Sequence, residues 1–196
     1  PRTSSAASDV YKRQVIGFVN AVILMPKFMT PDQIGLFRTL LSAALLLSNF
    51  GRFGVNSGLV RFKSLLKHPQ TELNSLYGLG ILIVFLSTLF FLIILIIFRS
   101  SWSDFYAEKS PQVNDYFILL IVLTLELIVF QFLQTLASIH KNIFSANLLK
   151  DLVYKCLNMG GILLFAASLI SFHTFINLHI GFYIVMIGIL FFESIY

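Results

Sequence analysis

A run of 22 residues without a charged side chain, Tyr77 to Phe98, constrains this chain more than any other feature. As an α-helix it would reach about 33 Å, and the hydrocarbon core of a bilayer is about 30 Å thick. The sequence is 57% hydrophobic and 12% charged, which is more apolar than a soluble domain of this size needs for one core. We therefore expect an integral membrane protein.

The same criterion predicts further membrane-spanning helices. They are expected near Ile34–Phe62, Tyr116–Ala137, Leu148–Ile170 and Ile176–Phe192. The apolar run Val15–Met29 cannot cross alone, because its 15 residues would reach only about 22 Å as a helix. Together these segments predict an all-α, polytopic transmembrane bundle of about six helices.

The first fourteen residues, PRTSSAASDVYKRQ, are polar and end abruptly at an apolar run. They resemble the translation of a sequencing adapter, and a signal peptide is disfavoured because no small-residue cleavage pattern follows Lys12 and Arg13. We expect a non-native segment over 1–14 and a six-helix bundle over 15–196, with its first helix truncated.

Basic residues in the predicted links indicate the orientation. Six of them lie in the links after the second and fourth spans: Arg61, Lys63, Lys67, Lys141, Lys150 and Lys155. The other links contain three, Lys27, Arg99 and Lys109, together with acidic residues. The positive-inside tendency therefore places the second and fourth links, and the N-terminal side of the chain, in the cytoplasm. The net charge of +5 is better explained by this asymmetry and by membrane lipids than by nucleic-acid binding.

The second predicted span, Ile34–Phe62, contains an unusual number of polar residues. Measured from Arg38 at about 100° per residue, Asn49, Arg52 and Asn56 all lie within about 40° on one helix face. Charge inside a bilayer is costly and usually marks a function. Because guanidinium groups suit phosphate and amides suit hydroxyls, we predict that these four residues line a substrate pathway. The alternative is that the span ends near Phe50, which would leave Arg52 as a cytoplasmic flank residue.

Glu126 lies near the middle of the predicted span Tyr116–Ala137. A carboxylate there costs on the order of 3 kcal/mol, so it is expected to face a partner or water. Two interpretations stay open: an ion-coupling residue in a transport cavity, or a structural hydrogen bond between helices.

Enzymatic signatures are absent from the sequence. The nine acidic residues are scattered, no phosphate-binding glycine loop is present, and only His68 has an acid nearby, Glu72. We therefore predict no catalytic residue, no metal or cofactor site and a transport function.

The order of motifs from Gly17 to Phe62 is distinctive. It reads G-F-V-N, then P-K-F-M-T-P-D-Q-I-G-L-F-R, then N-F-G-R-F-G-V-N-S-G-L-V-R-F. This order resembles the amino-terminal region of bacterial polysaccharide biosynthesis proteins. These are flippases of lipid-linked oligosaccharides for O-antigen, capsule and teichoic acid, and they belong to the superfamily that includes multidrug extruders.

The resemblance implies the N-terminal half of a transporter with twelve to fourteen helices in the bacterial inner membrane. The implied substrate is an undecaprenyl-diphosphate-linked glycan, and other polysaccharide-assembly membrane proteins are possible partners. Two alternatives stay open. A multidrug extruder of the same fold would favour an acidic or aromatic cavity, and a membrane-embedded glycan polymerase or ligase would need a larger outer loop than Arg99–Asp115.

Overall fold

The computed structural model describes residues 14–63, 69–107, 112–139 and 148–195, and all regular secondary structure in this described part is helical. Most of the expected non-native segment, residues 1–13, therefore lies outside the described residues. Four helices are long and apolar enough to cross a membrane: Pro31–Gly51, Ser75–Ile97, Phe117–Ile139 and Phe172–Phe192. By length and composition the chain is a membrane-embedded helical bundle, and the structure supports four spans of the six expected.

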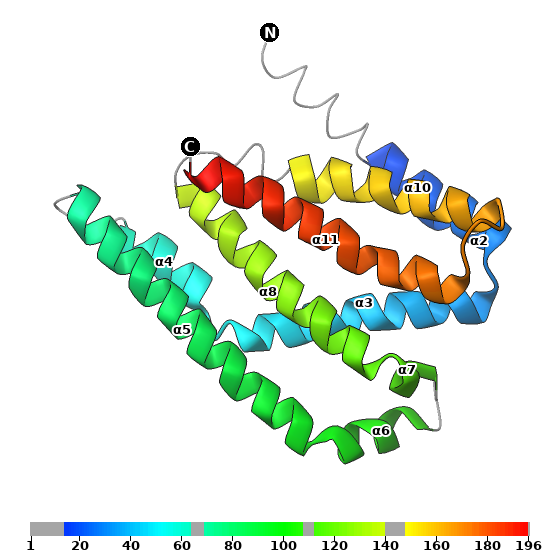
Figure 1. Cartoon of the computed structure of the whole chain (residues 1–196), viewed down its shortest axis with the longest axis horizontal. Coiled ribbons are helices and arrows are strands. Elements are labelled where there is room, and N and C mark those ends of the chain that lie inside the picture. Colours follow the sequence, from blue (N-terminus) through cyan, green and yellow to red (C-terminus); the bar gives the residue numbers. More distant parts are fainter. Residues whose placement is uncertain (1–13, 64–68, 108–111, 140–147, 196) are drawn as a thin grey trace, which may run out of the picture.

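The helices surround a central helix, α8 (Phe117–Ile139). α8 packs against α3 (Pro31–Gly51) and α11 (Phe172–Ile195), as Figure 1 shows. In the membrane-spanning window of α8, 56% of the residues are buried, against 17% in that of α5 (Pro69–Ile97). α5 is therefore the peripheral helix, and most of its surface is available to lipid.

The first helix and the predicted fifth span are shorter than a membrane crossing requires. The first helix covers Gln14–Phe28 and includes the π-helical segment η1 (Val19–Leu24) and α2 (Met25–Phe28). The predicted span Leu148–Ile170 consists of the π-helical segment η2 (Leu149–Val153) and α10 (Tyr154–Ala166). α10 ends early because a turn follows it, in which Ser168 adopts a positive φ of 58°.

The start of α3 follows from local sequence. Gln33 N donates to the Thr30 hydroxyl at 3.3 Å, and Thr30 N donates to Gln33 Oε1 at 3.0 Å. This capping box, with Pro31 as the first helical residue, satisfies amide groups that have no partner within the helix. α3 therefore begins three residues before the expected start of this span at Ile34.

The end of α3 differs from the predicted continuous span. α3 stops at Gly51 and α4 (Val55–Lys63) begins after a short break, so one helix over Ile34–Phe62 was wrong. Within the break, Phe53 and Gly54 both have positive φ, 45° and 74°. Two successive residues in the left-handed region interrupt the helical hydrogen bonds. The alternative end near Phe50 is therefore correct to within a residue.

Successive passes alternate in direction, as a polytopic protein requires. The start of α8 lies beside the start of α11, where His173 Nδ1 is 3.4 Å from the Tyr116 hydroxyl. Burial, and then the charge of Asp115, raise the pKa of Tyr116, so this hydroxyl keeps its proton and can donate. α10 returns against α11, with Tyr154 and Tyr183 ring centroids 5.3 Å apart.

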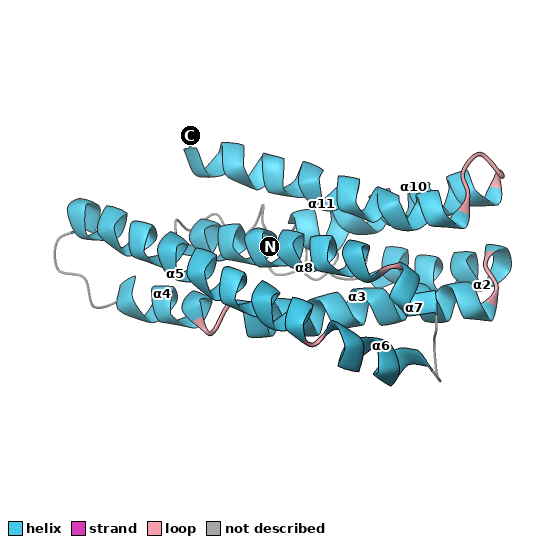
Figure 2. Cartoon of the chain, turned by 60° about the horizontal axis from the view of Figure 1, so that its bottom comes forward, coloured by secondary structure: helices cyan, strands magenta, loops and turns pink. Residues whose placement is uncertain are grey.

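Two short helices, α6 (Arg99–Ala107) and α7 (Gln112–Asp115), connect α5 to α8 (Figure 2).

Candidate functional site

The break between α3 and α4 begins beside the midpoint of α8. Gly51 packs so closely on Ile128 that an added Cβ would be 2.7 Å from Ile128 Cδ1, and Ile128 is the central residue of α8. α4 then continues the same pass, and Lys63 Nζ donates to the carbonyl of Ile139 at the end of α8. Arg52 therefore follows the end of α3 at a point beside the middle of α8, and α4 lies between Arg52 and the end of the bundle.

Arg52 caps α3 with its own side chain. Its Nε donates to the Ser48 carbonyl at 3.1 Å, and its Nη2 donates to Asn49 Oδ1. A guanidinium has five N–H donors in a planar fork, and Nη1 makes no hydrogen bond to any described residue. Part of the fork is therefore available to an anion.

Asn56 and Gln131 extend this arrangement from α4 to α8. Asn56 Nδ2 donates to the Gln131 carbonyl at 3.2 Å, and Gln131 Nε2 is 3.5 Å from the Ser48 hydroxyl. The Asn56 Oδ1 atom is buried and has no hydrogen-bond partner in the described part of the chain. We call these residues the break cluster; its members are Ser48, Asn49, Arg52, Asn56 and Gln131.

Three of the four predicted pathway residues, Asn49, Arg52 and Asn56, therefore meet at one place. Arg38 does not join them. It lies about 21 Å from Arg52 along the helix axis, at about 1.5 Å per residue, and it is exposed. Its Nη2 donates to the Ala21 carbonyl at 3.2 Å, which ties the first helix to α3. The two arginines share a helix face but are too far apart to bind the same diphosphate.

Glu126 is buried on α8, with 9% of its surface exposed. Its Oε2 atom is buried without a hydrogen-bond partner among the described residues. The carboxyl group lies within electrostatic range of Tyr183 on α11. Because Glu126 and Gln131 are separated by about 140° around α8, Glu126 is not part of the break cluster.

A histidine that sequence patterns did not single out is buried in the second layer of the bundle. His179 is 0% exposed, its Nδ1 is 3.0 Å from the Phe175 carbonyl, and its Nε2 is 3.3 Å from the Asn158 side chain. Asn158 then connects α10 to α11, which fits the usual role of a lone intramembrane asparagine. No spacing rule pairs two residues 21 apart on different helices.

No cluster of three or more potential metal ligands occurs among the described residues. The pair His68 and Glu72 cannot be evaluated as a site, because His68 and the side chain of Glu72 lie outside the described part. The chemistry that the structure offers is polar and ionic binding inside an apolar bundle.

Comparisons with known proteins do not identify the chain. No family model, curated protein or solved structure matches it. The class of protein therefore follows from the fold and the break cluster alone: a membrane-embedded helical bundle with an interrupted helix that carries polar side chains at its break.

Proposed function

We propose that this chain is the N-terminal half of a bacterial flippase for lipid-linked oligosaccharides, and that Arg52 binds the diphosphate of the substrate. The observation that carries the proposal is the position of Arg52 at a helix break beside the central residue of α8. An ionisable residue at such a position is costly, so it is a functional candidate by default. Its planar fork matches phosphate oxygens in a bidentate way.

The neighbours of Arg52 suit the glycan part of such a substrate. Asn49 is exposed, and Asn56 has a buried side-chain oxygen without a partner. Amide groups can accept and donate hydrogen bonds, as sugar hydroxyls require. Interrupted helices near the bilayer midplane are a recurring way for transporters to build substrate sites. In this proposal the polyprenyl chain stays in the lipid while the head group crosses at the break.

The test is glycan display in a strain that depends on the complete transporter. We expect Arg52→Ala to abolish surface glycan and leave membrane insertion intact. Arg52→Lys should retain part of the surface glycan, because a lysine keeps the charge but loses the planar fork of donors. Arg38→Ala is the matched control, since it removes the same group about 21 Å away and is expected to leave most display. Normal display with Arg52→Ala would refute the substrate role.

One observation favours the second candidate, a multidrug extruder of the same fold. Glu126 is a buried acid with an unpaired oxygen within electrostatic range of Tyr183, whose ring packs against Phe130. An acidic, aromatic environment suits cationic drugs. Under this candidate, Glu126→Gln would abolish drug resistance and Arg52→Ala would spare it, which is the reverse of the pattern expected for the flippase.

A further inference from the structure

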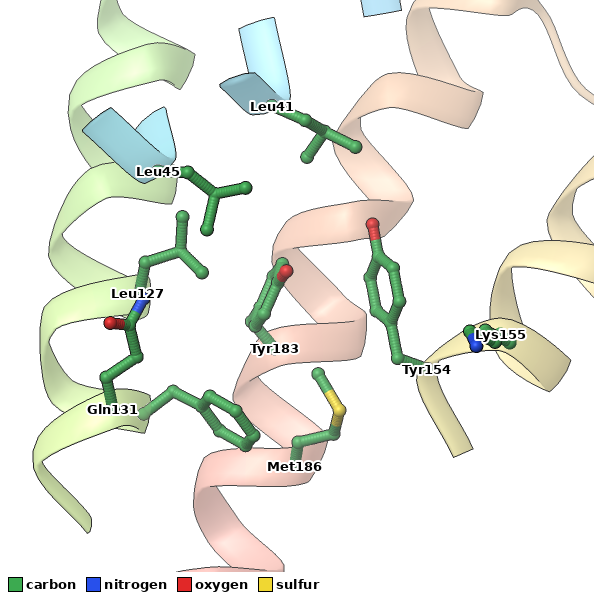
Figure 3. A pocket seen from close by; sticks show the side chains of 9 residues that line it. Leu41, Leu45, Leu127, Gln131, Tyr154, Lys155, Tyr183 and Met186 are labelled. Carbon is green, nitrogen blue, oxygen red and sulfur yellow. The ribbon is translucent and has the colours of Figure 1, made fainter. Parts of the chain in front are cut away.

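A cavity of about 260 Å³ lies inside the bundle, between α3, α8, α10 and α11 (Figure 3). Its walls include Leu45, Phe130, Tyr154 and Tyr183. Leu45 is exposed, so this wall borders the outside of the bundle. The proposed flippase mechanism assigns no role to this space.

The cavity is apolar with a few polar groups. Phe130 and Tyr183 have ring centroids 6.0 Å apart, and Tyr154 and Tyr183 have centroids 5.3 Å apart. The side chains of Gln131 and Lys155 also line the cavity, at its edge toward α8 and α10. Apolar and aromatic walls with a small number of placed polar groups are typical of small-molecule sites.

The Tyr154 hydroxyl is the feature that indicates a ligand. Its oxygen is buried and has no hydrogen-bond partner in the part of the chain that the structure describes. The Tyr183 hydroxyl is its nearest polar neighbour, and the two hydroxyls interact, but this interaction leaves the Tyr154 oxygen without a hydrogen bond of normal length and angle. In Figure 3 the Tyr154 hydroxyl points from α10 toward the α3 wall of the cavity. A buried hydroxyl without a partner is costly, and a ligand oxygen would remove that cost.

The volume and walls limit the size and type of the ligand. An apolar cavity of about 150 Å³ is large enough for benzene, so 260 Å³ accommodates one ring with a small substituent. Aromatic walls favour an aromatic ligand through edge and offset ring contacts. A neutral oxygen can pair with Tyr154 without the cost of burying a charge.

We propose that this cavity binds a small aromatic molecule that carries one neutral oxygen substituent, with the ring between Phe130, Tyr154 and Tyr183 and the oxygen on the Tyr154 hydroxyl. The site is separate from Arg52 and does not depend on the flippase proposal. Gln131 belongs both to the cavity wall and to the break cluster, so it connects the two sites.

The experiment uses the chain in lipid nanodiscs, labelled with 3-fluorotyrosine and titrated with benzyl alcohol under fluorine NMR. The sequence has seven tyrosines, so the others report how the probe affects the lipid. We expect saturable shifts at two resonances only, assigned with Tyr154→Phe and Tyr183→Phe. Toluene, which has the same ring without the oxygen, should bind about five-fold more weakly, the size of one neutral hydrogen bond.

Tyr154→Phe should weaken benzyl alcohol about five-fold, read at the Tyr183 resonance, and leave toluene unchanged. Tyr77→Phe, on the peripheral helix α5, is the matched control and should change neither. Equal shifts at all tyrosines would mean partition into lipid and would overturn the proposal, as would equal binding of the two probes to the unmodified chain. The comparison of benzyl alcohol with toluene on the unmodified chain needs no variant, so it tests the proposal even if Tyr154→Phe does not fold.

Discussion

Glu126 is buried in the bundle, whereas Arg52 lies half-buried at the break between α3 and α4, and their surroundings differ. Arg52 has two hydrogen bonds to its own helix, whereas the Oε2 atom of Glu126 has no partner among the described residues. A buried carboxyl group in this situation is either protonated or bound to a cation, because an isolated buried charge is too costly. Glu126 is therefore the better candidate for ion coupling, and Arg52 for anion binding.

Glu126→Gln separates the two interpretations of this residue. Glutamine keeps the shape and can hydrogen-bond, but it can neither release a proton nor attract a cation. We expect transport in the unmodified protein to depend on pH or on sodium, and the variant to lose that dependence while folding normally. Measuring transport in proteoliposomes over a range of external pH and sodium checks this. An unmodified protein that responds to neither would contradict coupling and leave the structural role.

At the scale of elements, the break between α3 and α4 decides what this pass can do. A continuous helix would have satisfied its own backbone groups and carried its polar side chains along one face. The break instead turns the chain at Phe53 and Gly54, and it gathers Asn49, Arg52 and Asn56 beside α8. Two glycines have distinct roles here: Gly51 allows close packing, and Gly54 allows the positive φ.

The conformational role of Gly54 predicts an effect of Gly54→Ala. Its φ of 74° costs an alanine about 1 kcal/mol or more, although no neighbour lies within 4 Å of the added Cβ. We expect this variant to lower the unfolding free energy in detergent by about that amount. Gly58→Ala is the matched control, because Gly58 lies in α4 with similar open space; it should be neutral or stabilising. Equal effects of the two changes would show that the backbone conformation is not responsible.

The packing role of Gly51 predicts a specific rescue. Gly51→Ala places a Cβ 2.7 Å from Ile128 Cδ1, and such overpacking costs about 1–3 kcal/mol. Ile128→Val removes that Cδ1 atom. In a double-mutant cycle of unfolding free energies, we therefore expect Ile128→Val to recover part of the loss caused by Gly51→Ala. Strictly additive effects would mean that the two residues are not in contact.

At the scale of the whole molecule, the ends of the helices divide into two groups. Lys63 donates to Ile139, which brings the second and fourth links to the same end of the bundle. The starts of α8 and α11 meet at the opposite end, through Tyr116 and His173. Of the six basic residues counted in those two links, Arg61 and Lys63 lie in the last turn of α4 at this end, Lys67 and Lys141 lie outside the described residues, and Lys155 lies within α10; the positive-inside orientation stays a prediction.

Cysteine labelling tests this topology. The sequence has one cysteine, so Cys156→Ser gives a background without thiols. In intact cells we expect a membrane-impermeant maleimide to label Ser101→Cys and Ala167→Cys, and to label Phe62→Cys only after permeabilisation. All three positions are exposed in the structure. The reverse pattern would invert the orientation, and labelling of only one of the first two would contradict the alternation of passes.

Several features were predictable from sequence because they depend on neighbours along the chain. The apolar runs specified helices of membrane length, since backbone groups in lipid must be satisfied within the segment. Thr30, Pro31 and Gln33 specified the start of α3 by capping. Lone intramembrane asparagines usually join helices, and Asn20 and Asn158 do so, through the Lys155 carbonyl and His179.

Other features could be decided only by the tertiary structure. The helical angle placed Arg38 and Arg52 on one face, but depth depends on how α3 packs against α8, so only the packing separated them. The angle also could not show that Gly51 meets the centre of α8. The sequence determined that this chain is a helical membrane protein with polar groups in the second pass. Tertiary packing decided which of those groups meet, because contacts between helices depend on the crossing point of two surfaces, and no single segment contains that information.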